Sequence, residues 1–243
     1  MNTAARYFEY LNSKLREVMD QELPNIEKAA RLIADSCMNG GRLYAFGSGH
    51  SHLIAEELYI RAGGLALVHA ILPQELMLNQ MATKSTMLER LEGFGPALID
   101  LYHVEARDVL MVISNSGRNA VPVEMCLAAK AKGAKVIALT SMQHTSGCTS
   151  RHSSGKKICD IADVVLDNHA VKGDAGLWVE GLHTPIGPTS DAVGIAIAQA
   201  MISEAIDMMV KAGFEPPVFT SSNVDGGDEK NAALYEKYYG YWK

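Results

Sequence analysis

The chain has few cysteines and no cluster of cationic residues. Four of its 243 residues are cysteine (Cys37, Cys126, Cys148 and Cys159), too sparse for a disulfide framework in a chain of this length. Lys and Arg number 22 against 28 Asp and Glu, which gives a net charge of −6, and no basic run offsets that balance. This average field repels a phosphate polyanion such as DNA, so we expect no nucleic-acid partner.

Long apolar runs are also scarce. None approaches the roughly 20 residues that a membrane span needs, so no membrane association is expected. The first 18 residues are amphipathic and include acidic side chains, which is unlike a secretory signal. Apolar residues make up 48% and charged residues 21%, an ordinary balance for a globular core. We therefore expect a cytoplasmic protein.

Short apolar runs alternate with helix-patterned stretches through the middle of the chain. The runs of strand length are 42–46, 65–70, 108–113, 134–140 and 161–166, and the helix-patterned stretches are 52–62, 74–91 with a break, 119–132 and 143–157. Strands that are apolar on both faces and alternate with helices indicate a parallel sheet covered on both sides. Right-handed crossovers then predict an α/β fold with a doubly wound five-stranded sheet in the flavodoxin-like order 2-1-3-4-5.

Helices are predicted on both sides of this core. Residues 5–20 have helical apolar spacing, and Pro24 can open a second helix that runs toward Gly40-Gly41. Residues 187–211 predict a long helix that is apolar nearly all round, which favours burial in the core and in a partner subunit. Residues 213–230 are typical of an extended arm, and the aromatic ending 234–243 is expected to dock on another surface.

We treat residues 1–243 as a single domain. It comprises N-terminal helices (1–38), an α/β core (39–211) and a C-terminal arm (212–243). The apolar helix and aromatic ending predict a homo-oligomer, a dimer or a tetramer.

The first predicted strand leads into Gly47-Ser48-Gly49-His50-Ser51-His52 and then a helix. Glycines after a strand bring backbone N–H groups close to a ligand, and a helix N-terminus favours an anion. A tight turn in any doubly wound sheet would look similar. The segment is neither a P-loop, because no Gly-Lys-Ser/Thr follows, nor a dinucleotide fingerprint, because Leu53 stands where the third glycine would be.

The third strand leads into Ser114-Asn115-Ser116-Gly117-Arg118-Asn119 and another helix. Its hydroxyls, amides and N–H groups are neutral donors suited to phosphate oxygens. Helix capping by Ser116 or Asn119 would explain one such residue, but here four occur within six positions. Strands 1 and 3 are neighbours at the switch point of a 2-1-3-4-5 sheet, so both loops are expected to meet there.

The pair strand–GSGHS–helix and strand–SNSGRN–helix resembles the SIS (sugar isomerase) domain family, over roughly residues 25–210. The tracts SRHSSGKK and GLHTPIGPTS resemble a stand-alone, phosphosugar-binding branch of that family. The resemblance implies carbohydrate metabolism and a sugar-phosphate ligand. It implies contacts to the phosphate or sugar from the following residues: Ser48, His50, Ser51, Ser114, Asn115, Ser116 and Asn119.

The catalytic base is less evident. Relatives with phosphoheptose isomerase or muramic-acid etherase activity carry a glutamate ten residues past the position of Ser51, where this chain has Arg61. Glucosamine-phosphate synthase places its glutamate just after the second strand, which implies Glu75 here. Glu57, with Glu56, is the next choice. His52 or His183 could assist ring opening.

Other polar residues have ordinary explanations. Glu89 and Glu92 are one helical turn apart, and a solvated helix face is the favoured interpretation. The metal-capable tract His144, Cys148, His152 and Cys159 matches no zinc spacing, so we predict no metal, and isomerisation requires no organic cofactor. The segment from Arg151 to Lys156 suits a polar loop beside an anionic ligand, or equally an ordinary solvated connection.

The sequence thus favours an aldose–ketose isomerase acting on a sugar phosphate or amino-sugar phosphate. A lyase or etherase acting on an N-acetylamino-sugar phosphate is an alternative that also begins with removal of an α proton. A non-catalytic phosphosugar sensor is a third possibility. It would need a protein partner, because no basic helix-turn-helix precedes the loops.

Overall fold

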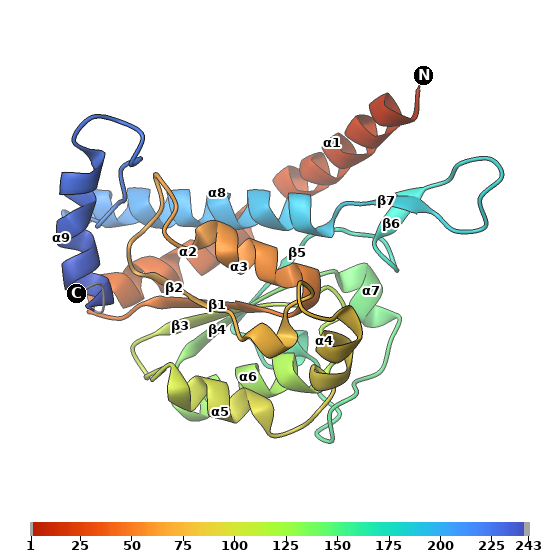
Figure 1. Cartoon of the computed structure of the whole chain (residues 1–243), viewed down its shortest axis with the longest axis horizontal. Coiled ribbons are helices and arrows are strands. Elements are labelled where there is room, and N and C mark those ends of the chain that lie inside the picture. Colours follow the sequence, from red (N-terminus) through yellow and green to blue (C-terminus); the bar gives the residue numbers. More distant parts are fainter. Residues whose placement is uncertain (1, 241–243) are drawn as a thin grey trace.

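The computed structural model describes residues 2–240, except for the side chain of Ala82. Its centre is a five-stranded parallel sheet in the order β2-β1-β3-β4-β5, as predicted (Figure 1). The strands are β1 (Leu43–Gly47), β2 (Val68–Ile71), β3 (Val109–Ile113), β4 (Lys135–Thr140) and β5 (Val164–Asp167). Every residue of β1 and β3 is buried. Consecutive residues of these two strands point to opposite faces of the sheet, so both faces must be covered.

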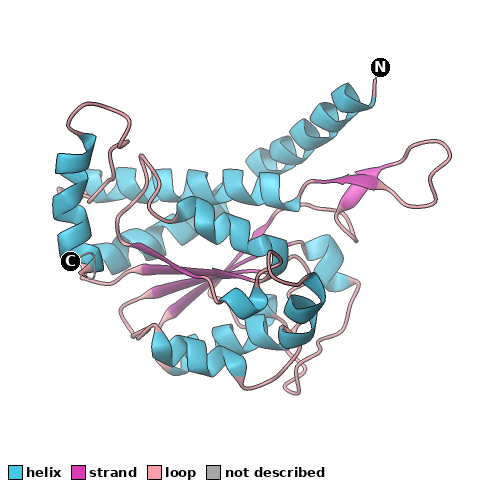
Figure 2. Ribbon diagram, in the orientation of Figure 1, coloured by secondary structure: helices cyan, strands magenta, loops and turns pink. Residues whose placement is uncertain are grey.

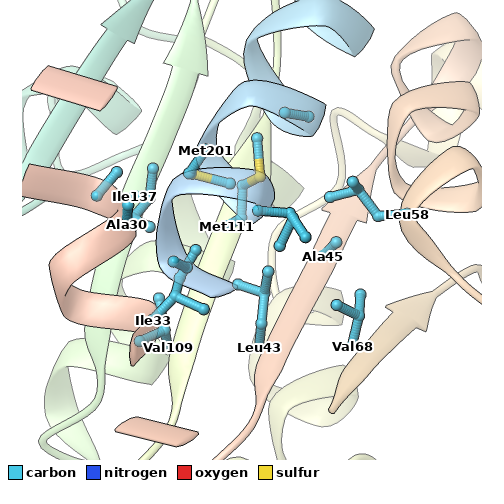
Figure 3. Close-up of a cluster of buried hydrophobic side chains, with 14 of the residues drawn as sticks. Ala30, Ile33, Leu43, Ala45, Leu58, Val68, Val109, Met111, Ile137 and Met201 are labelled. Atoms are coloured by element: carbon cyan, nitrogen blue, oxygen red, sulfur yellow. The ribbon is translucent and has the colours of Figure 1, made fainter. Parts of the chain in front are cut away.

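Two layers of helices cover the sheet (Figure 2). One face carries α2 (Leu23–Met38), α3 (His52–Leu58) and α8 (Ser190–Lys211), and the other carries α5 (Phe94–Leu101) and α6 (Ala120–Ala131). In the first layer, Ile33 of α2 and Met201 of α8 pack with Leu43 and Met111 of the sheet (Figure 3). Each of these four side chains is almost fully removed from water, and burying one contributes roughly 1.5–3 kcal/mol.

The long helix α8 was predicted as a core element, and half of its apolar stretch is buried within the fold. By length and composition alone it could span a bilayer, so the expectation that no apolar run reaches that length was wrong. Its packing against α2 and α3 explains its composition. Its glycine, Gly194, lets Ile54 of α3 approach closely, because a Cβ there would collide with that side chain.

Other elements differ from the predictions. The stretch 143–157 was predicted to be helical, but α7 (Met142–Ser146) is the one α-helix there. A loop follows it, and then a short 3-10 helix, η3 (Ile158–Asp160). The stretch 74–91 forms η2 (Gln74–Leu76) and α4 (Ala82–Leu88). Helix α5 was not predicted, nor was the hairpin of β6 (Ala175–Leu177) and β7 (Ile186–Pro188). Helix α1 (Thr3–Gln21) projects from the body of the fold, on the side of this hairpin (Figure 1).

The C-terminal segment is more ordered than an arm. It forms α9 (Gly227–Tyr239), which begins inside the stretch expected to be extended. The predicted aromatic docking is confirmed for the described residues up to 240: Tyr239 is buried, stacks on His69 of β2 with ring centroids 4.9 Å apart, and donates to the Val68 carbonyl at 2.8 Å. Residues 241–243 lie outside the described part of the chain.

Candidate functional site

The two serine-bearing loops begin side by side. Gly47, the last residue of β1, pairs with Ile113, the last residue of β3. Ser48 and Ser114 are the next residues along the two chains, and both are buried. From β1 the chain moves outward to β2 and then returns to the other side for β3, so this is the switch point of the sheet. The predicted meeting of the loops is confirmed.

The first loop depends on its glycines. A Cβ on Gly47 would collide with the Ser51 carbonyl, and Gly49 adopts a φ of +57°, which disfavours other residues. His52 begins α3, and its Nδ1 contacts the Gly49 carbonyl. Because a carbonyl only accepts, Nδ1 is the protonated nitrogen, and Nε2 lies 3.7 Å from Glu56. The imidazole is therefore held against the loop backbone.

The second loop wraps the N-terminus of α6. Gly117 has a φ of +61°, and its N–H donates to the Ser114 hydroxyl at 3.2 Å. Asn115 accepts from Asn168 at 3.1 Å, a contact that ties the loop to the end of β5. Asn119 occupies the cap position of α6, yet its side chain makes no capping hydrogen bond. The capping explanation is therefore wrong for Asn119, whose amide is used elsewhere.

Glu89 joins the two loops. It lies at the end of α4, where one carboxylate oxygen accepts from the Ser48 hydroxyl at 2.5 Å and the other accepts from Asn119 Nδ2 at 2.6 Å. Its carbonyl accepts from the Val121 N–H in the first turn of α6. The solvated-face interpretation is wrong for Glu89, because α4 folds back over the carboxyl edge of the sheet and turns this carboxylate toward both loops.

Arg151 lies close to this carboxylate and to the second loop. Arg151 Nη1 donates to Asn119 Oδ1 at 2.8 Å, and the Arg151 N–H donates to the carbonyl of Arg118. Burial, then Arg118 and Arg90, lower the pKa of Arg151, whereas Glu89 raises it. The Arg118 Nε is buried with no hydrogen-bond partner among the described residues. The second loop thus adds converging positive charge to its neutral donors, which favours an anion.

Helix α8 contributes an acid to the first loop. Asp191 lies in its first turn; burial raises its pKa, whereas His50 and His52 lower it. His50 is exposed. Just before Asp191, Ser190 and the backbone of Thr189 donate to Asp174, which fixes the entry to α8 beside the loop. The carboxylate of Asp191 therefore interacts electrostatically with the histidines of the first loop.

The predicted bases Glu75 and Glu57, and His183, which was predicted to assist ring opening, lie in three separate places. Glu75 in η2 is exposed and lines a hollow of about 350 Å³ with Leu88, Leu91, Glu92, Gly93 and Phe94. Glu57 pairs with Arg61 at 3.2 Å and accepts from Gln199 of α8. His183 is exposed in the β6–β7 hairpin, which extends away from the body of the fold (Figure 1). Among the described residues, none of the three makes a side-chain hydrogen bond to either loop.

Sequence reasoning missed three contributors: Glu89, Asp191 and the direct role of Arg151. The spacing of Glu89 and Glu92 carried no signal, because their partners lie on segments distant in sequence. For Arg151 a signal existed, since a polar loop beside an anionic ligand was one of two interpretations. Its contact with Asn119 favours that one.

The geometry defines a class of site: a doubly wound α/β fold with an anion-suited pair of loops at its switch point and a carboxylate between them. A family model for the SIS domain matches residues 6–141. The chain belongs to the SIS domain family.

The chain is also similar to a curated relative over nearly its whole length and to solved structures of the same fold. The chain is 54% identical over 232 residues to the UPF0309 protein BH3325 of Halalkalibacterium halodurans, covering 96% of each chain. Among solved structures it resembles phosphoheptose isomerase GmhA from Neisseria gonorrhoeae, with a TM-score of 0.59 and 21% identity over 84% of this chain and 97% of that one. A phosphoheptose isomerase from Francisella tularensis gives a TM-score of 0.56 and 18% identity, over 85% and 100% of the two chains. At these identities the structural likeness shows the fold.

Proposed function

We propose that this protein binds a sugar phosphate at the two loops and interconverts its aldose and ketose forms. The observation that carries the proposal is the Glu89 carboxylate, held by Ser48 of one loop and Asn119 of the other. The names of the structural neighbours, two phosphoheptose isomerases, agree with this reaction class.

The phosphate is assigned to the second loop. The N–H groups at the start of α6 and the hydroxyls of Ser114 and Ser116 would donate to its oxygens, together with Asn115 and Asn119. Ser51 would add a donor from the first loop, and Ser48 and His50 would lie near the sugar. Arg118 and Arg151 would supply the compensating positive charge.

Glu89 is the base that we favour. With the phosphate anchored at α6, Glu89 would remove the proton from C2 of the open-chain aldose. The C2–H electron pair forms the enediolate double bond, and the C1 carbonyl oxygen takes the negative charge. Return of a proton to C1 and transfer of the C2 hydroxyl proton to the C1 oxygen give the ketose. His52 would assist ring opening through Nε2, and His183 is the other candidate for that step.

Deuterium exchange tests this assignment. A panel of sugar phosphates is incubated with the protein in D₂O, and NMR follows label entering C1 or C2. We expect Glu89→Gln to slow exchange by about 10²–10⁴-fold, the usual contribution of a positioned base. Glu105→Gln is the matched control, since Glu105 pairs with Arg107 at a distant surface. If Glu75→Gln abolishes exchange while Glu89→Gln preserves it, the base is Glu75. A released non-sugar fragment would indicate the lyase or etherase alternative.

We also propose a cytoplasmic homo-oligomer. All four cysteines are free. Phe8 on the projecting α1 is 63% exposed and Trp178 on the hairpin 61% exposed, and apolar surface of this kind favours a second copy. Light scattering in solution measures the mass, and a monomer at all concentrations would contradict this part of the proposal.

A further inference from the structure

One serine of the first loop contacts the favoured base directly. Ser48 follows the last residue of β1, is only 7% exposed, and donates its hydroxyl proton to Glu89 Oε1 at 2.5 Å. We propose that Ser48 is a second catalytic residue of the isomerisation, and that its hydroxyl relays a proton from the C2 oxygen to the C1 oxygen of the sugar. This inference rests on the proposed function, with Glu89 as the base.

Interconversion of an aldose and a ketose moves two protons. One leaves C2 and returns to C1, and Glu89 is assigned to that transfer. The other leaves the C2 hydroxyl and reaches the C1 oxygen. The two oxygens are on adjacent carbons, so a single hydroxyl that touches both can accept one proton while it donates another.

The hydrogen bonds of Ser48 leave it available for this role. Ser48 stands at the N-terminal cap position of η1 (Gly49–Ser51), yet its side chain makes no capping hydrogen bond, and its proton goes to Glu89 instead. Among the described residues no group donates to Ser48 Oγ, so the lone pairs of this oxygen are open to a sugar hydroxyl. Ser114 of the second loop differs, because its Oγ accepts from the Gly117 N–H. Ser48 is therefore hydrogen-bonded to the base alone.

The contact with Glu89 sets the order of the two transfers. A hydroxyl binds an ionised acceptor about twice as strongly as a neutral one, so Ser48 stays turned toward Glu89 while the carboxylate is charged. When Glu89 takes the proton from C2, the negative charge moves to the C1 oxygen of the enediolate. That oxygen is then the stronger acceptor, and the Ser48 hydroxyl turns to it. The relay thus becomes available only after the enediolate has formed.

The transfers balance in protons and electrons. The Ser48 hydroxyl gives its proton to the C1 oxygen, and the C2 hydroxyl gives its proton to Ser48 Oγ in the same step, which leaves the negative charge on the C2 oxygen. Glu89 then returns its proton to C1. The electron pair of the C1–C2 double bond forms the new C1–H bond, and a lone pair of the C2 oxygen forms the ketose carbonyl. Ser48 ends as a hydroxyl and Glu89 as a carboxylate.

Exchange and conversion, measured on one sample, separate the relay from the base. The probes are aldose phosphates of five, six and seven carbons in D₂O, and NMR follows deuterium at C2 of the unconverted aldose beside formation of the ketose. Ser48→Ala keeps Glu89, so the enediolate still forms and returns, and exchange at C2 should change by less than about tenfold. Ketose formation should fall by about 10²–10⁴-fold, the usual contribution of a positioned proton-transfer group.

Two further variants accompany this measurement. Ser48→Thr keeps a hydroxyl at the position and should recover ketose formation to within about tenfold of the unaltered chain. Ser203→Ala is the matched control, because Ser203 is exposed on α8 and its hydroxyl donates to the Gln199 carbonyl. Melting curves show which variants are folded. If the threonine variant does not fold, the ratio of exchange to conversion in Ser48→Ala decides alone.

The outcomes distinguish the relay from the function on which it rests. An equal fall of exchange and conversion in Ser48→Ala would overturn the relay, since a serine that only positions Glu89 affects both transfers together. Ketose formation that Ser48→Ala leaves unchanged would overturn it as well, and in both cases the proposed isomerase activity stands. If the unaltered chain neither exchanges nor converts any probe, the proposed function fails and the relay fails with it.

Discussion

His69 should make the docking of the C-terminal helix sensitive to acid. Its ring lies between Tyr44, at a centroid distance of 5.7 Å, and Tyr239 of α9, at 4.9 Å. Its Nε2 is buried without a hydrogen-bond partner among the described residues. Burial, and then the charge of Arg42, lower the pKa of His69 from 6.5 to about 4.

The direction in which pH changes the free energy of unfolding follows from the number of protons bound by the folded and unfolded chains. Between these two values the unfolded chain binds a proton at residue 69 and the folded chain does not, so acid favours unfolding. The contribution to stability is complete above pH 6.5 and is lost as the pH falls toward 4. With a folded-state pKa of about 4, the loss is about 1 kcal/mol at pH 6, about 2 kcal/mol at pH 5 and about 3 kcal/mol at pH 4. These are upper values, because solvent reaches part of the ring.

Urea unfolding at pH 7.5, 6 and 5 measures this effect, with His69→Phe as the comparison. Phenylalanine preserves an aromatic ring between the two tyrosines and does not titrate. The difference in unfolding free energy between the two proteins should therefore change by about 2 kcal/mol from pH 7.5 to pH 5. A difference that stays constant across this range would refute the assignment of a neutral, buried imidazole.

Two further substitutions test the loops. Gly47→Ala should destabilise the protein by roughly 2–4 kcal/mol, because its Cβ meets the Ser51 carbonyl. At Gly49 an added Cβ faces open space, so Gly49→Ala should cost only the roughly 1–2 kcal/mol of holding alanine at a φ of +57°. Urea unfolding measures both losses of unfolding free energy, and equal losses for the two variants would contradict this account. Asn119→Ala removes the contact shared by Glu89 and Arg151 and should weaken binding of inorganic phosphate by about 10–100-fold in calorimetry. Unchanged affinity would place the phosphate elsewhere.

The sheet and its loops were predictable because their signals are local. Runs such as Val109–Ile113 are apolar at every position, which occurs where both faces of a strand are covered. The order of the strands then brought Gly47 beside Ile113, and the two loops together. No element of this prediction required knowledge of side-chain contacts.

The acid between the loops was not predictable, because its position depends on how α4 returns over the sheet. In the sequence, Glu89 and Glu92 look alike, yet in the structure one contacts Ser48 and the other Ser153. The helix α9 was missed for a related reason. Its sequence is polar and opens with Gly227, so its order comes from aromatic packing of Tyr239 rather than from helical periodicity.

The most direct test of the central claim is a thermal melt of the full chain with sugar phosphates, each beside its unphosphorylated sugar. A ligand at 100 times its Kd stabilises the folded state by about 2.7 kcal/mol, which raises the Tm of a chain of this size by roughly 5–10 °C. The account predicts a rise confined to phosphorylated sugars and lost in Asn119→Ala. A normal melt that no sugar phosphate shifts would contradict it.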